Sequence, residues 1–229
     1  MSKIKSVSAK TIREAAEIIS AGGTVVVPTD TNYNVVTSPY SQHGVNRIFD
    51  MKKRESLSPL TLFLGDSMEF PRYAYTTPLA EYLAKRLWPE KISFICWQKP
   101  TTPSYITRGF GTVACTVHEN AVHREIAHLI GTPLAGTSAN LSGTGNVPAV
   151  QKAVEHLGEH VDLIIDAGTS AVDDANTIID LTFDRPMLAR AGAYPVEKVL
   201  ELLPDMVVDK NKDEYKALAK QRVGKPAIA

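Results

Sequence analysis

Short apolar runs rich in β-branched residues alternate with amphipathic helical stretches along most of this 229-residue chain. The run at 24–27 is too short for a helix, whereas the stretch at 8–22 repeats its apolar residues at helical spacing. We expect further helices at 41–51, 77–88, 121–130, 148–157 and 195–203, and further strands at 59–64, 92–97, 112–117, 133–136, 161–166, 177–181 and 187–189.

Two of the predicted strands follow each other without a helix between them. Residues 92–97 and 112–117 are joined by a short segment rich in Pro and Thr, which we interpret as a surface loop. Parallel neighbours need a long crossover, usually a helix, so this pair argues against a purely parallel sheet. The sequence therefore predicts an α/β fold with a mixed sheet and helices packed on it.

The two ends of the chain are less regular. Thr11 and Glu14 are spaced as a capping box for the first helix.

From Asp205 the chain is polar and weakly patterned, with a loosely docked helix expected at 213–221. We expect one domain over residues 1–204 and a C-terminal tail over residues 205–229.

The formal charge is balanced, with 25 Lys plus Arg against 25 Asp plus Glu. Such a chain has no global field that draws it to nucleic acid, so RNA binding would need a local basic patch. The start lacks an apolar signal core, and no apolar run approaches the roughly 20 residues that span a bilayer. We expect a cytoplasmic protein without a membrane partner.

Cys96 and Cys115 are interpreted as small buried hydrophobes, although a disulfide between them stays open.

Residues 23–34 pass abruptly from an apolar to a polar pattern. The apolar run ends on Pro28 and continues into Thr29, Asp30 and Thr31. This is typical of a buried strand that delivers polar side chains to the rim of a cavity. A plain turn after a core strand is the alternative, because Pro, Asp and Asn all favour turns.

A second transition resembles the first. The strand predicted at 133–136 opens into hydroxyl and amide side chains, namely Thr137, Ser138, Asn140 and Ser142. Cations stand at two further element ends, with Lys52 and Arg54 after the helix at 41–51 and Arg190 after the last strand. For Lys52 and Arg54 the alternative is a simple interaction with the negative end of the helix dipole.

Cations together with hydroxyl and amide donors suit a phosphate-bearing ligand when no Walker-type loop is present. No Ser, His and Asp set indicates a nucleophilic triad. The histidines are interpreted mostly as solvated residues on helices or at helix ends, and they are His43, His118, His123, His128, His156 and His160. Catalysis would then depend on positioning and charge stabilisation, as in phosphoryl or nucleotidyl transfer. We nominate no catalytic side chain and no metal ligand.

With these motifs the sequence resembles the YrdC/Sua5 (TsaC-type) L-threonylcarbamoyladenylate synthases, over roughly residues 8–203. The matching motifs occur in the family's order. They are Pro-Thr-Asp-Thr at 28–31 with Tyr33, Lys-x-Arg at 52–54, Pro-Leu at 59–60, Trp-Pro at 88–89, Ser-Ala-Asn-Leu-Ser-Gly at 138–143, the segment 177–181, and Arg-Ala-Gly at 190–192.

The resemblance implies a YrdC-like twisted open mixed sheet with helices packed around a large concave basic cavity. It implies conversion of ATP, bicarbonate and L-threonine to threonylcarbamoyl-AMP and pyrophosphate, with Mg²⁺ accompanying ATP, for the modification of adenosine 37 in tRNA. By matching position, the nucleotide would contact Lys52, Arg54, Thr112, Ser138, Asn140 and Arg190. The amino acid would lie against Thr31, Tyr33, Thr116 and Asn176.

Departures from the family pattern gather on the amino-acid side. Thr116 stands where the family has an Arg expected to hold the threonine carboxylate, and Asn176 replaces a Ser. Ser58, Asn34 and His118 replace a Lys, a Gly and a Pro. Losing a charge-assisted pair to a carboxylate costs about 2 to 5 kcal/mol. The sequence thus keeps the nucleotide half of the pattern better than the threonine half.

Three functions stay open at this point. The first is a synthase acting on threonine or on another amine or acid. The second is a binding module that holds double-stranded RNA or tRNA without chemistry. The third is a degenerate member that scaffolds a partner.

Overall fold

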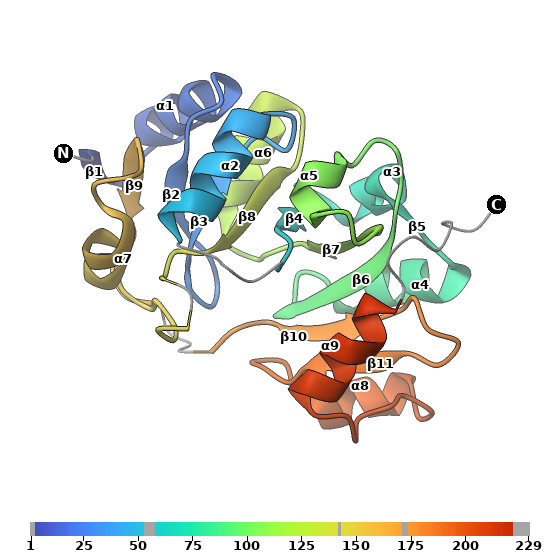
Figure 1. Ribbon diagram of the computed structural model, residues 1–229. Coiled ribbons are helices and arrows are strands. Elements are labelled where there is room, and N and C mark those ends of the chain that lie inside the picture. The colour runs from blue at the N-terminus through green and yellow to red at the C-terminus, as the bar shows by residue number, and fades with distance from the viewer. Residues whose placement is uncertain (1–2, 53–57, 142, 171–173, 222–229) are drawn as a thin grey trace.

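Eleven strands join into one twisted mixed sheet in the computed structural model, which describes residues 3–52, 58–141, 143–170 and 174–221 (Figure 1). The strands are β1 (Lys3–Ser6), β2 (Val25–Pro28), β3 (Tyr33–Thr37), β4 (Thr61–Phe63), β5 (Ala74–Tyr75), β6 (Ile92–Gln98), β7 (Thr112–Thr116), β8 (Leu134–Ser138), β9 (Leu163–Asp166), β10 (Thr177–Asp180) and β11 (Met187–Arg190). Their order is β1-β9-β2-β3-β8-β4-β7-β6-β10-β11, and β5 pairs with β6.

The helices connect and cover these strands. They are α1 (Ala9–Ser20), α2 (Gln42–Met51), the 3₁₀ turn η1 (Ser67–Glu69), α3 (Phe70–Tyr73), α4 (Pro78–Leu87), α5 (Ser104–Thr107), α6 (Ala121–Ile130), α7 (Val150–Leu157), α8 (Val196–Leu202) and α9 (Lys212–Lys220). Every predicted helix and strand is present within a few residues. The sequence interpretation did not anticipate β1, β3 as a strand of its own, η1, α3, β5 or the short α5 inside the loop at 99–111.

The sheet is mixed, as the sequence predicts. β6 and β7 pair antiparallel, with Phe94 opposite Cys115, while β4 and β7 pair parallel. Both cysteines are buried free thiols, which confirms that they act as small hydrophobes.

The capping box predicted at Thr11 and Glu14 is wrong. Helix α1 begins earlier, and Ser8 is its N-cap, with its hydroxyl accepting the N–H of Thr11 at 3.1 Å. Glu14 pairs instead with Lys5 on β1. Ser8 and Thr11 both carry a hydroxyl that suits an N-cap, and the spacing in the sequence alone did not distinguish between them.

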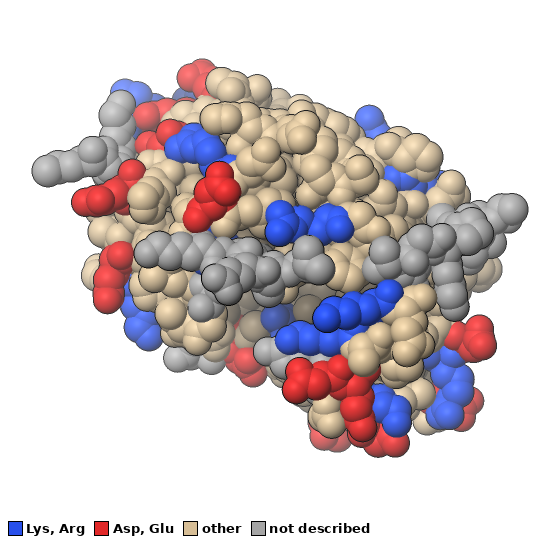
Figure 2. Space-filling view, viewed as in Figure 1, with Lys and Arg blue, Asp and Glu red and all other residues tan. Residues whose placement is uncertain are grey.

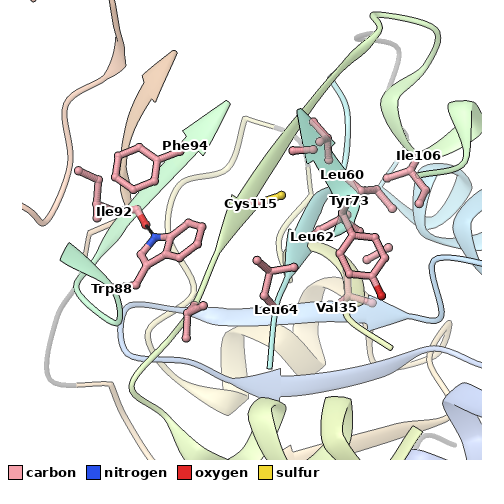
Figure 3. Packing of buried hydrophobic residues seen from close by; sticks show 14 of the residues in the cluster. Val35, Leu60, Leu62, Leu64, Tyr73, Trp88, Ile92, Phe94, Ile106 and Cys115 are labelled. Carbon is pink, nitrogen blue, oxygen red and sulfur yellow. Dashed lines mark hydrogen bonds between the residues drawn. The ribbon is translucent and has the colours of Figure 1, made fainter. Parts of the chain in front are cut away.

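The two faces of the sheet carry different helices. On one face, α1 and α6 pack over β2, β3, β4, β8 and β9 in a cluster that includes Ile19, Val27, Phe63 and Ile126. The other face carries the larger core, with side chains from α2, α4, α7 and α8. Figure 3 shows part of this core, where the Trp88 indole N–H donates to the carbonyl of Ile92 at 2.9 Å.

The C-terminal segment is joined to the sheet edge. Met206 is buried, and Val207 forms a bridge with Met187 of β11. The helix expected at 213–221 is present as α9, and its Tyr215 hydroxyl donates to Asp180 Oδ2 at 2.8 Å, so it is docked on the sheet edge. In Figure 1, α9 lies beside β10 and β11. No helix among the described residues is long and apolar enough to cross a membrane.

Candidate active site

The turn between β2 and β3 is closed by its own polar side chains. The Thr29 hydroxyl donates to the Asn32 carbonyl at 2.6 Å, and Asn34 Nδ2 donates back to Thr29 Oγ1 at 3.1 Å. Asn32 ties this turn to two distant segments: its Nδ2 donates to the Asp174 carbonyl, and its Oδ1 accepts the N–H of Val147, each at 2.8 Å. The turn alternative is therefore correct as local geometry, and the turn is also a junction of three loops.

Tyr33 is placed in the core by this turn. Its hydroxyl donates to the Gly168 carbonyl at 2.8 Å and accepts the N–H of Ala167 at 2.9 Å. Burial raises the pKa of this phenol, against the hydrogen bond from Ala167. In this structure the predicted substrate residue Tyr33 thus faces protein groups and fixes the loop after β9.

Lys52, Ser138 and Asn140 meet although they lie far apart in the chain. The Lys52 side chain is 2% exposed, and its Nζ donates to the Asn140 carbonyl and side-chain oxygen at 2.6 and 2.8 Å and also to the Ser138 carbonyl. The Ser138 hydroxyl donates to Asn140 Oδ1 at 2.6 Å. Here Lys52 shapes the segment after β8, which places the Ser138 and Asn140 side chains.

Four neutral side chains form a second, buried group. Asn176 Nδ2 lies 3.2 Å from Thr116 Oγ1 and 3.3 Å from Ser93 Oγ, and Asn176 Oδ1 lies 3.5 Å from Thr31 Oγ1. Thr116 donates in turn to the Ile92 carbonyl at 3.0 Å. The structure thus joins the predicted Thr31, Thr116 and Asn176. It adds Ser93, whose position in an apolar strand pattern gave no signal of a site.

Arg190 stands at the border of this neutral group. Its Nε and Nη2 donate to the Asn176 carbonyl at 2.9 and 2.7 Å, while much of its side chain stays exposed. Partial desolvation lowers the pKa of the guanidinium and nearby Asp174 opposes that shift. An arginine keeps its charge through such changes, so Arg190 presents a cation beside the group.

Part of one sheet face is open. Paired residues point to the same face, so Thr61, Ala114 and Ile95 continue the face that α1 and α6 cover elsewhere. These three are half-exposed, whereas their neighbours Val113 and Cys115 are buried in the core on the other face. This open part of the sheet is a suitable floor for a ligand.

Thr112 and Thr116 flank this floor from the two ends of β7. They share the face of Ala114, and they lie four residue steps apart along the strand, a distance of about 13 Å. Figure 2 shows Lys and Arg side chains over the region of α5 and over the region of α9. These cations form a basic rim on two sides of the half-exposed part of the sheet.

Arg54 lies outside the described residues, as does Ser142. Among the described residues, no group of three or more His, Cys, Asp or Glu side chains is placed to hold a metal ion.

Asp30 of the β2–β3 turn is half-buried and faces two buried histidines. Asp30 Oδ2 lies 3.3 Å from His118 Nδ1, and the His118 and His123 rings stand edge to face with centroids 4.9 Å apart. Burial acts to raise the pKa of Asp30, but His118 and the backbone N–H groups of Glu119 and Asn120 outweigh it and lower the pKa. Burial, together with His118, puts the pKa of His123 well below its usual value.

The interpretation of the histidines as solvated residues is wrong for His118 and His123. Both are buried, at 3% and 0% exposure, and both rings pack against Phe63. The sequence gave no signal for this, because helical position alone does not say which side of a helix another element covers.

The fold and the site define a class of α/β protein with a half-open sheet face, a basic rim, and polar clusters at the ends of strands. A family model named Sua5_yciO_yrdC and described as telomere recombination matches residues 17–192. The chain belongs to this Sua5/YciO/YrdC family.

The chain is 31% identical over 196 residues to the threonylcarbamoyl-AMP synthase of Pyrococcus abyssi, which covers 85% of this chain and 58% of that protein. It therefore spans little more than half the length of that relative. The structure of P. abyssi Sua5 complexed with L-threonine superposes with a TM-score of 0.84 at 28% identity, covering 93% of this chain and 65% of the other. The structure of E. coli YciO gives a TM-score of 0.80 at 26% identity, covering 86% and 98%.

Proposed function

We propose that this protein is an ATP-dependent nucleotidyltransferase of the threonylcarbamoyl-AMP synthase type. It uses ATP, bicarbonate and an amino acid, L-threonine by resemblance, and releases pyrophosphate. Its product serves the threonylcarbamoylation of adenosine 37 in tRNA, in the cytoplasm. Residues 1–204 carry this activity, and residues 205–229 are an added segment.

The observation that carries the proposal is the meeting of Lys52 with Ser138 and Asn140. Hydrogen bonds of Lys52 Nζ join the Lys-x-Arg motif to the Ser-x-Asn motif, which lies 86 residues further along the chain. Both motifs belong to the pattern of the family to which the chain belongs. Hydroxyl, amide and backbone groups held in this way can bind phosphate oxygens. Arg54, Thr112 and Arg190 complete the proposed nucleotide side.

The proposed amino-acid side consists of Thr31, Tyr33, Thr116 and Asn176. Mg²⁺ would reach the site with the triphosphate, since Mg²⁺ in such enzymes is held largely by phosphates and water. The described side chains offer no dedicated metal cage of their own.

The test is ATP-dependent pyrophosphate release in the presence of bicarbonate and L-threonine. Arg54→Ala should lower the rate by about 10- to 100-fold, because it removes charge-assisted hydrogen bonds to phosphate. Arg47→Ala is the matched control, since Arg47 lies on α2 and pairs with Asp162. Equal rates for Arg54→Ala and wild type, or no pyrophosphate release by wild type with any amino acid, would contradict the proposal.

In a second candidate function, the protein catalyses the same ATP-dependent reaction with a substrate other than threonine. The group of Thr31, Ser93, Thr116 and Asn176 is neutral, and it contains the position where the family pattern has an arginine. A neutral group favours a substrate without a free carboxylate at that point. The same assay with a panel of amino acids, their amides and simple amines distinguishes the two: threonine as the best substrate removes this candidate.

The cations at the rim in Figure 2 keep RNA binding as a third candidate. Binding of tRNA or double-stranded RNA that depends on phosphate contacts weakens steeply with salt. A filter-binding titration at several salt concentrations decides, and salt-independent binding or none would remove this candidate.

A further inference from the structure

We infer that Asp30 is a positioning residue, whose carboxylate fixes the turn carrying Thr31 against the segment between β7 and α6. The inference deepens the proposed function and rests on it, because it concerns the placing of residues on the amino-acid side of the site.

Asp30 uses both carboxylate oxygens. Oδ1 accepts the N–H of Asn120 at 2.6 Å, and Oδ2 accepts the N–H of Glu119 at 2.8 Å. The His118 Nδ1 lies 3.3 Å from Oδ2. Three consecutive residues of the β7–α6 junction therefore meet one side chain of the β2–β3 turn, across 89 residues of sequence.

The two segments joined by Asp30 both supply residues of the neutral group. Thr31 follows Asp30 directly, and its hydroxyl lies 3.5 Å from Asn176 Oδ1. Thr116 ends β7 just before the junction, and its hydroxyl lies 3.2 Å from Asn176 Nδ2. A shift between turn and junction would thus change the distance between Thr31 and Thr116.

The charge and shape of the side chain both matter. An asparagine keeps only one acceptor oxygen, so one of the two N–H groups would face an amide N–H₂. The carboxylate also lies at the N-terminal end of the ten-residue helix α6, where a negative charge is favourable. A glutamate keeps the charge and both acceptors at a longer reach.

Asp162 provides a matched control. Its Oδ2 accepts the N–H of Thr24 at 2.7 Å and it pairs with Arg47, so it holds the start of β2 as Asp30 holds its end. It also has a lowered pKa, where burial is outweighed by Arg47 and Thr24. Asp162 takes no part in the proposed site.

The experiment compares Asp30→Asn, Asp30→Glu and Asp162→Asn with wild type. We expect Asp30→Asn to raise the KM for the amino acid about tenfold or more, with the KM for ATP within about twofold of wild type. Asp30→Glu should recover part of that loss. Amide hydrogen exchange should quicken at residues 29–34 and 119–120 in Asp30→Asn, and only near residue 24 in Asp162→Asn.

Equal changes in both KM values, or exchange at residues 29–34 that matches wild type, would overturn the inference. If wild type releases no pyrophosphate, the proposed function fails, and the exchange data still decide whether Asp30 fixes the turn. If Asp30→Asn does not fold, Asp30→Glu serves as the test: a shifted amino-acid KM with local exchange supports the role, and a uniform loss of stability contradicts it.

Discussion

The buried pair His118 and His123 shows what single residues contribute behind the site. His118 Nδ1 lies 3.3 Å from Asp30 Oδ2, whereas neither ring nitrogen of His123 has a hydrogen-bond partner among the described residues. A buried imidazole without a partner is stable only in its neutral form. Protonation of His123 would therefore work against the native state.

His123→Leu should change how stability depends on pH. The pKa of His123 lies well below 6.5 in the folded protein, so between pH 6.5 and that lower value the unfolded chain binds a proton that the native protein does not. Wild type then loses up to about 1.4 kcal/mol per pH unit as the pH falls through this window. The variant has no imidazole at this position and should not show this loss. Its free energy of unfolding minus that of wild type should therefore increase as the pH is lowered from 7.5 to 5.5, as measured by urea unfolding.

The exposed His43, on α2, provides the control. His43→Leu should keep the pH dependence of wild type. If His123→Leu shows the same pH dependence as wild type as well, the burial of a neutral imidazole is not what sets stability in this range.

At the scale of elements, the hairpin of β10 and β11 places Arg190 against the neutral group. Gly192 lies so close to the segment just before β10 that an added Cβ would stand 2.1 Å from the Ala175 carbonyl oxygen and 2.8 Å from the Asn176 carbonyl carbon. Its N–H donates to Thr177 Oγ1 at 3.0 Å. Only a residue without a side chain permits this approach.

Gly192→Ala should therefore separate Arg190 from the Asn176 carbonyl. We expect a loss of about 1 to 3 kcal/mol in unfolding free energy from the forced shift, and weaker ATP binding in a calorimetric titration. Gly131→Ala is the control: Gly131 has φ +67° and open space around it, so alanine there adds backbone strain away from the site. Wild-type ATP affinity in Gly192→Ala would show that the hairpin does not position the nucleotide side.

At the scale of the whole molecule, the C-terminal segment is packed onto the sheet edge. Met206 is buried, Val207 bridges to β11, and Tyr215 reaches Asp180 of β10. Asp180 is paired with Ile95 of β6, so α9 contacts the same face that is half-open at Ile95. The segment thus belongs to the wall beside the candidate site.

Tyr215→Phe should loosen this contact. Removing the hydroxyl deletes one hydrogen bond to a carboxylate and should cost about 1 to 2 kcal/mol, with faster amide exchange across residues 212–220. Tyr82→Phe on the exposed face of α4 should change neither quantity. Unchanged exchange in Tyr215→Phe would mean that α9 is held by its other contacts alone.

Local sequence determined the elements of this protein. β-branched runs and helical stripes are short-range patterns, and so the helices and most strands lie within a few residues of their predicted bounds. No helix was predicted between 92–97 and 112–117, and this was enough to predict that the sheet is not purely parallel, although the short α5 lies in that loop. The polar residues after Pro28 and Gly136 were recognisable because they follow buried strands directly.

Tertiary structure decided which of those polar groups meet and what they face. The contacts of Lys52 with Ser138 and Asn140, of Asn176 with Thr116 and Ser93, and of Asp30 with residues 118–120 all join distant segments. Burial of His118 and His123 likewise depends on Phe63 from another strand. Such long-range contacts leave no period or spacing in the sequence, because they depend on how the twisted sheet brings separate strand ends together.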